Sequence, residues 1–311
     1  METKKNKFLT NRFFVAISAL ICCALWGSAT PFIKVGYELI LPEQTTASTI
    51  LFAGIRFAIA GIVTVLIYSI ARRTFLYPKK ENWGRIAVVS CSQTIIQYML
   101  FFIGLANTSG VKGTIISGSN AFFAMLVACL IFRQEKITFK KVIACIIGFA
   151  GIVVVNLNGL DFNMTLTGEG FVLFSSISYA FSSAFMKKYS SYEDPVVISG
   201  YQFILGGAVM MIIGVVSGGK VIFETTQAVA VLIYLAFVSA ISYSLWGVLL
   251  KYNSVSKVTI YTFTTPVFGV LLSAVMLTEQ SNVTPINLLI TLILVCTGIL
   301  ILNYKKDDLI K

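Results

Sequence analysis

Residues 26–34 read Trp-Gly-Ser-Ala-Thr-Pro-Phe-Ile-Lys and occur late in the first long apolar segment of the chain. Pro31 cannot donate a backbone N–H, and Ser28, Thr30 and Lys34 stand where a lipid-facing helix would carry aliphatic side chains. We therefore expect a bent helix, with Pro31 as its hinge, whose polar side chains face a cavity rather than lipid.

The composition indicates an integral membrane protein. Of the 311 residues, 57% are hydrophobic and only 12% are charged, and the mean hydropathy is +0.87. A net charge of +11 would suggest a nucleic-acid partner in a soluble chain. Here the basic residues fall almost entirely between long apolar segments, so they indicate topology, and we expect a lipid bilayer and no nucleic acid as partner.

Histidine is absent, and all six cysteines fall within predicted apolar segments. These features favour neither a disulfide framework nor a metal site, and they remove the commonest general base and zinc ligand. We therefore predict no metal, no cofactor and no enzymatic activity of the zinc-protease kind. A cleaved signal peptide is the alternative for the first segment, but the pattern continues to Lys34 and recurs later in the chain.

Ten segments are long and apolar enough to cross a bilayer. They run roughly over 13–35, 46–71, 84–106, 110–132, 139–157, 169–187, 195–217, 227–251, 256–277 and 284–303. Their connections are short, so no soluble domain is inserted. The sequence predicts an all-α membrane protein with ten transmembrane helices.

Basic residues gather in alternate connections, as the positive-inside rule requires of cytoplasmic loops. Examples are Arg72 and Arg73 after the second span and Lys140 and Lys141 after the fourth, whereas the other side holds little beyond Lys112 and Lys220. Both termini are then cytoplasmic, which requires an even number of spans. We expect a multi-pass protein of the plasma membrane.

The chain reads as two related halves, residues 1–157 and 158–311. The matching pairs are Phe32-Ile33-Lys34 with Phe185-Met186-Lys187, Arg56-Phe57 with Gln202-Phe203, and Tyr98 with Tyr243. Five spans per half is an odd number, so the halves would have inverted topology. Inverted repeats commonly place a substrate site between them, which favours a transporter over an enzyme.

Several motifs occur in an order that resembles a known family. They are Trp26-Gly27-Ser28, Phe32-Ile33-Lys34, Arg56-Phe57 and Thr265-Pro266-Val267-Phe268 leading to Glu279. Together they resemble the EamA-type transporters of the drug/metabolite transporter superfamily. The resemblance implies a ten-helix inverted-repeat bundle that moves small organic metabolites, often outward, by alternating access. It also implies a hinge at Pro266, whereas the first half carries Asn120-Ala121 and no proline at the matching place.

Every Asp and Glu lies at or beyond a predicted span end, so no intramembrane carboxylate is available to couple protons or bind a cation. A neutral, zwitterionic or anionic substrate follows. Arg56 lies well inside the second span, where an uncompensated charge costs at least ~2.5 kcal/mol. Arg56 either binds an anion as a clamp or caps backbone carbonyls as a structural residue, and we favour the structural role. Lys34 and Lys187 are expected to snorkel, with carbonyl contacts that gate the path as the alternative.

We predict a secondary transporter, an exporter, of a small polar organic metabolite such as an amino acid. The chain is expected to act as a monomer. The rival functions are a lipid or lipid-linked sugar flippase and, less favoured, a membrane-embedded transferase. Aromatic, amide and hydroxyl side chains would line the substrate cavity. The predicted lining residues are Trp26, Ser28, Thr30, Gln93, Gln97, Asn120, Tyr179, Ser183, Tyr243, Trp246, Tyr261 and Thr264.

Overall fold

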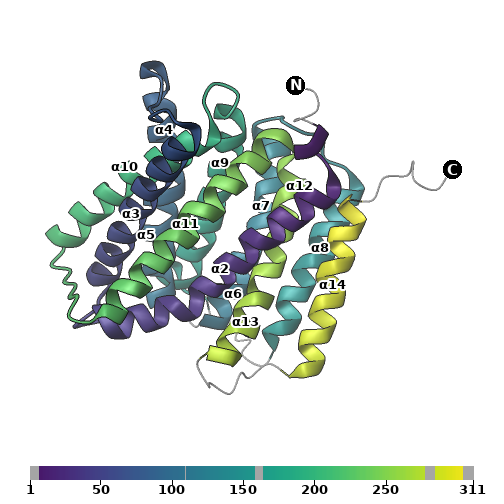
Figure 1. Ribbon diagram of the computed structural model, residues 1–311. Coiled ribbons are helices and arrows are strands. Elements are labelled where there is room, and N and C mark those ends of the chain that lie inside the picture. The colour runs from purple at the N-terminus through teal and green to yellow at the C-terminus, as the bar shows by residue number, and fades with distance from the viewer. Residues whose placement is uncertain (1–6, 109, 158–163, 277–283, 304–311) are drawn as a thin grey trace.

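The computed structural model describes residues 7–108, 110–157, 164–276 and 284–303, and within these ranges the chain is helical and contains no strand (Figure 1). Glu279 and both chain ends lie outside the described residues. The α-helices are α2 (Arg12–Ile40), α3 (Thr46–Arg72), α4 (Trp83–Val89), α5 (Gln97–Ala106), α6 (Gly110–Gly118), α7 (Asn120–Leu126), α8 (Phe139–Val155), α9 (Phe171–Tyr189), α10 (Pro195–Val216), α11 (Thr226–Tyr252), α12 (Val255–Thr259), α13 (Thr265–Met276) and α14 (Pro285–Asn303). Shorter segments join them: the π-helical η2 (Ser90–Ile96), η3 (Val127–Ile131) and η5 (Leu166–Gly170), and the 3-10 helices η1 (Lys80–Asn82) and η6 (Ile260–Thr264).

The helices confirm a multi-pass membrane protein. Within the described residues, eight helical stretches are long and apolar enough to cross a bilayer. The two remaining expected spans are helical as well: α8 has 17 residues, and α9 is rich in serine. Large apolar side chains stay exposed on the outside of the bundle, for example Phe13 at 75%, Ile70 at 77% and Val216 at 82%. Such exposure suits a surface covered by lipid.

Polar residues in the connections set where the helices begin. The side chain of Asn11 accepts hydrogen bonds from the first backbone N–H groups of α2, and Thr45 does the same for α3. Asp194 caps α10, whose first residue is Pro195, a position where the missing N–H costs nothing. These caps lie at the span ends, where polar groups can also meet water and lipid head groups.

The helices pack in pairs taken from the two predicted halves. Figure 1 shows α3 with α10 on one side of the bundle and α8 with α14 on the other. Between these pairs, α2 packs against α11 and α13, while α9 packs against α5 and α7. The partners of α9 in the first half thus mirror the partners of α2 in the second.

Small residues allow the two flanking pairs to come close. A methyl group on Gly207 of α10 would lie 2.5 Å from the backbone nitrogen of Ala58 and 2.7 Å from the Gly54 carbonyl oxygen of α3. On the other flank, a methyl group on Gly298 would lie 2.7 Å from the Ala144 carbonyl oxygen. The small residues of the Gly54-xxx-Ala58 and Ala144-xxx-Gly148 motifs therefore pack the chain against itself.

Both the fourth and the ninth predicted spans are interrupted at matching places. Ser119 separates α6 from α7, and the 3-10 helix η6 separates α12 from α13. Pro266 lies in the first turn of α13, where it displaces no hydrogen bond. The fourth span therefore breaks without a proline; the Ser119 hydroxyl donates to the Ile116 carbonyl at the break. Helix α2, by contrast, stays helical through Pro31, and the hinge there stays a prediction.

The crossing of α2 and α13 gives the first testable prediction. A methyl group on Gly27 would lie 2.6 Å from Phe268 Cβ and 2.9 Å from the Thr265 carbonyl oxygen. Gly27→Ala should lower the free energy of unfolding by about 1–3 kcal/mol through overpacking. Gly84→Ala is the matched control, because nothing lies within 4 Å of the added methyl group. Thermal unfolding in detergent measures both; equal melting temperatures for the two variants would contradict the close crossing.

Candidate functional site

Six aromatic side chains form a layer across the middle of the bundle, and we call Trp26, Phe57, Tyr98, Phe203, Tyr243 and Trp246 the aromatic layer. The Trp26 ring of α2 lies 5.2 Å from the Tyr243 ring and 4.9 Å from the Trp246 ring of α11. Phe57 of α3 stacks on Phe203 of α10 at 5.1 Å, and Phe203 meets Tyr243 edge-on at 4.9 Å. These arrangements are the favourable ones for aromatic pairs.

Hydroxyl groups connect this layer to neighbouring helices. The Tyr98 and Tyr243 hydroxyls, one from each predicted half, hydrogen-bond to each other. Tyr179 of α9 lies close to Ser183 on its own helix and to the Trp246 indole, although its hydroxyl makes no hydrogen bond of normal geometry with either. Three of the predicted lining residues from α9 and α11 therefore meet on one side of the layer.

Buried polar atoms without a hydrogen-bond partner concentrate among the predicted lining residues. Seven of the twelve carry such an atom: Trp26, Gln93, Gln97, Asn120, Tyr179, Ser183 and Trp246. Unpaired buried polar atoms are rare in proteins and costly in a bilayer, where no water compensates them. Gln93 also lies in the π-helical η2, a local geometry that is frequent at functional sites. Such atoms are free to bind a ligand.

The other five predicted lining residues either have a hydrogen-bond partner or are exposed. Ser28 hydrogen-bonds to the Tyr234 hydroxyl at 2.7 Å, and Thr30 is exposed beside Gly269. The Tyr261 hydroxyl accepts a hydrogen bond from Asn303. The hydroxyls of Tyr243 and Thr264 are also occupied, that of Thr264 by the backbone carbonyl of Tyr261.

Three of the predicted lining residues are tightly packed. Tyr179 and Tyr243 are 4% and 6% exposed, and Trp246 only 2%. The ring contacts bring Trp26, Tyr243 and Trp246 together, while the contact of the predicted lining residues with substrate stays a prediction.

Arg56 lies beside the aromatic layer and is 5% exposed. Its guanidinium carbon is 4.5 Å from the centre of the Phe57 ring. It donates no hydrogen bond to a backbone carbonyl among the described residues, and its Nε atom is buried without a partner. The favoured prediction of a structural residue that caps carbonyls therefore has no support in the observed contacts.

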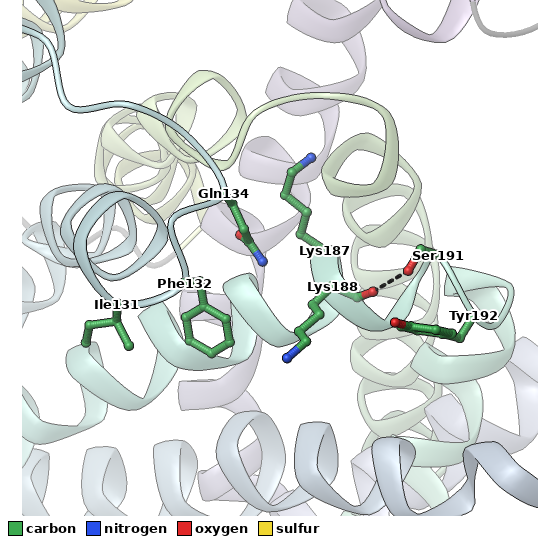
Figure 2. A pocket seen from close by; sticks show the side chains of 7 residues that line it. All are labelled: Ile131, Phe132, Gln134, Lys187, Lys188, Ser191 and Tyr192. Atoms are coloured by element: carbon green, nitrogen blue, oxygen red, sulfur yellow. Dashed lines mark hydrogen bonds between the residues drawn. The ribbon is translucent and has the colours of Figure 1, made fainter.

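The basic connections meet at one end of the bundle, which we call the basic end. A cleft of about 570 Å³ opens there, as Figure 2 shows. Lys187 and Lys188 point to opposite sides of it. Lys187 Nζ donates to the carbonyls of Leu250 and Asn253 at 3.1 and 2.5 Å. Lys187 thus makes carbonyl contacts of the kind that the alternative to snorkelling requires, because the C-terminal carbonyls of α11 lie within reach, while a gating role stays a prediction.

Polar contacts between the predicted halves bridge the basic end. Glu135 accepts hydrogen bonds from the backbone N–H and the hydroxyl of Ser256 and forms an ion pair with Lys141 at 2.6 Å. Arg72 pairs with Asp194 at 2.7 Å. Passage through this end would require some of these contacts to break.

Glu169, in η5 before α9, bridges the halves at the opposite end. Its carboxylate accepts hydrogen bonds from the Thr108 hydroxyl at 2.5 Å and the Thr165 backbone N–H at 2.7 Å, and Lys112 pairs with it at 3.4 Å. The bond from Thr108, followed by that from Thr165, lowers the pKa of Glu169 from 4.5 to about 2.

The chain is similar to several proteins that are named as transporters. The sequence model of the EamA-like transporter family matches residues 13–157 and again residues 166–304. The chain belongs to the EamA-like transporter family.

Two similar proteins illustrate the range of this EamA-like family. The uncharacterized transporter YvbV of Bacillus subtilis is 28% identical over 288 residues, which cover 91% of this chain and 89% of YvbV. A chloroplastic WAT1-related protein of Arabidopsis thaliana is 23% identical over 295 residues, covering 91% of this chain and 68% of that protein. A solved crystal structure aligns with a TM-score of 0.76 at 15% identity, over 97% of this chain and all of that one, which shows a shared fold.

Several residues of the aromatic layer were not predicted from the sequence. Phe57, Phe203 and Tyr98 belong to the aromatic layer but were not among the predicted lining residues. A signal for them existed, because Phe57 matches Phe203 and Tyr98 matches Tyr243 between the halves. Tyr234, the partner of Ser28, had no such signal.

The lowered pKa of Glu169 predicts a pH effect on stability. A carboxylate whose pKa is depressed on folding stabilises the protein above the unfolded pKa, and this contribution disappears as the pH falls through the folded pKa. Stability from Glu169 should therefore be lost between pH 4.5 and about 2. Melting temperatures in detergent should fall more steeply over this window for the native protein than for Glu169→Gln. Glu43→Gln, at an exposed position, is the control and should keep the native pH profile.

Proposed function

We propose that the protein is a secondary transporter of a small polar organic metabolite, of the amino-acid class, which it exports across the plasma membrane. Membership of the EamA-like family supports transport. The single observation that carries the substrate class is the set of unpartnered buried polar atoms around the aromatic layer. The outward direction follows from the family resemblance.

The unpartnered atoms include both donors and acceptors. Trp26 and Trp246 offer indole N–H donors, whereas Gln93, Gln97 and Asn120 offer amide oxygens as acceptors. A zwitterion needs both kinds of partner, since its carboxylate accepts hydrogen bonds and its ammonium group donates them. The faces of the tryptophan rings can in addition attract an ammonium group. The indole donors favour an amino acid over a bare cation, and the cation–π attraction favours it over a neutral sugar.

Alternating access between two inverted five-helix repeats is the proposed mechanism. Two observations support it: the family model matches the chain twice, and the helix pairings of the first half mirror those of the second. Ten spans with both termini in the cytoplasm would place the basic end inside the cell. We further propose that the protein works as a monomer, because its small-residue motifs are already used within the chain.

The substrate site would lie at the aromatic layer, with the polar contacts of Glu135 and Glu169 on either side of it. Opening toward the cytoplasm requires the Glu135 bonds to Ser256 to break, while opening toward the other side requires the Glu169 bonds to Thr108 and Lys112 to break. Breaks in the helices at Ser119 and η6 give the chain places where backbone angles can change.

Transport assays test the assignment. In proteoliposomes containing the purified protein, uptake of radiolabelled amino acids should exceed that in empty vesicles. Trp26→Ala and Tyr179→Ala should each lower the initial rate about tenfold or more, because a lost aromatic contact of about 1.4 kcal/mol corresponds to a factor of ten.

Tyr77→Ala is the control for these variants, because Tyr77 is 64% exposed and lies outside the aromatic layer. It should transport at the native rate. Melting temperatures in detergent would show that the variants are folded. Native transport rates in both Trp26→Ala and Tyr179→Ala would refute the proposed site.

A further inference from the structure

Arg56 is a cation buried deep within a membrane-spanning helix. It lies near the middle of α3, and only 5% of it is exposed. The charge of Arg56 acts on tyrosines of three other helices: Tyr37 of α2, Tyr98 of α5 and Tyr243 of α11. Two of these tyrosines form the hydroxyl pair of the aromatic layer, so Arg56 borders the proposed substrate site.

No negative charge compensates Arg56 among the described residues. Its contact with Phe57 is a cation–π contact at 4.5 Å, and its tyrosine neighbours are neutral. Within the described residues, Arg56 forms no ion pair and no hydrogen bond, and its Nε atom is buried without a hydrogen-bond partner. A guanidinium has five N–H donors in a fixed arrangement, so this group can bind an anion strongly.

Two other partly buried cations among the described residues do have carboxylate partners. Lys141 pairs with Glu135 at 2.6 Å, and Lys112 pairs with Glu169 at 3.4 Å. Gln202, which occupies the place of Arg56 in the second half, accepts a hydrogen bond from the Thr94 hydroxyl at 2.5 Å and carries no charge, although its amide nitrogen has no partner. Arg56 thus differs from these lysines in having no carboxylate beside it.

We propose that Arg56 binds the carboxylate of the substrate, so that the site takes small monocarboxylates, amino-acid zwitterions included. This inference rests on the proposed transport function and adds the residue that selects the substrate class. The planar guanidinium can donate two parallel hydrogen bonds to a carboxylate. The Tyr98 and Tyr243 pair uses one of its two O–H protons internally, which leaves one to donate to the same carboxylate.

Charge balance favours a carboxylate over a phosphate monoester. One guanidinium neutralises one carboxylate, whereas a phosphate monoester carries a charge of roughly −1.5 to −2 at pH 7 and would leave a buried negative charge. Among the described residues, Arg56 is the only cation whose charge acts on Tyr37, Tyr98 and Tyr243. A carboxylate therefore completes the site without a new uncompensated charge.

The first part of the test needs no ligand. Arg56→Gln places in the first half the residue that the second half carries at Gln202. If the charge of Arg56 is uncompensated without substrate, its removal should leave the melting temperature of the ligand-free protein unchanged or raise it. A structural arginine would instead stabilise the fold, and Arg56→Gln would lower the melting temperature by several degrees. Arg72→Gln, at an exposed ion pair on the same helix, is the control and should change little.

The second part measures thermal shifts of the full-length protein in detergent at pH 7. The compounds are the L-amino acids, their C-terminal amides, glucose and glycerol 3-phosphate. At least one amino acid should raise the melting temperature of the native protein, and its amide should not. Arg56→Gln should require at least tenfold more of that amino acid for the same shift, and Arg72→Gln should respond as the native protein does.

The outcomes separate this inference from the proposed function. Equal shifts with acid and amide, retained in Arg56→Gln, would overturn the role of Arg56 and leave transport standing. A shift with glycerol 3-phosphate alone would overturn the carboxylate assignment. If no compound binds, the proposed substrate class fails, and the ligand-free melting temperature decides the inference: a fall in Arg56→Gln overturns it, and no fall supports an open anion site.

Discussion

The backbone contact between α2 and α13 at Gly27 positions the candidate site. With no side chain at Gly27, the two helices approach until the Thr265 carbonyl and the Phe268 side chain occupy the place of a methyl group. This approach lets Cys23 Sγ donate to the Tyr261 carbonyl at 3.2 Å and brings the Trp26 ring against α11. A wider crossing would separate Trp26 from its aromatic partners and open the layer.

The bilayer explains why the unpartnered atoms matter. Many hydroxyls in this chain donate to a carbonyl of their own helix, as Ser182 does to Tyr179 and Thr264 does to Tyr261. Such bonds satisfy a polar group without any tertiary partner. Tyr179 and Ser183 lie on the same serine-rich helix, yet their hydroxyls have no partner. Half of the buried polar atoms without a partner among the described residues lie on predicted lining residues, where a substrate could replace the missing bonds.

Charges divide the molecule into a centre and two ends. The carboxylates of Glu135 and Glu169 hold the predicted halves together at opposite ends, each with a lysine beside it. At the centre, Arg56 lies over the Phe57 ring and near Tyr98, and it forms no ion pair with any residue that the structure describes. Alternating access would require the polar contacts at one end to break while those at the other end stay formed. Polar contacts at span ends can exchange protein partners for water at small cost. A buried cation at the centre cannot exchange a protein partner for water in this way. We therefore propose that the substrate is the partner of Arg56.

The amino-acid sequence by itself determined the membrane class, the helical segments and the family, because long apolar stretches and motif order depend on the chain alone. It also indicated some of the aromatic partners, since Phe57 matches Phe203 and Tyr98 matches Tyr243 between the two halves. Only the tertiary structure decided which polar groups were already occupied: Ser28 is bound to Tyr234, Lys187 is bound to the end of α11, and Arg56 is open. Hydrogen-bond partners come from helices far apart in sequence, and their distances follow from packing that no local pattern records.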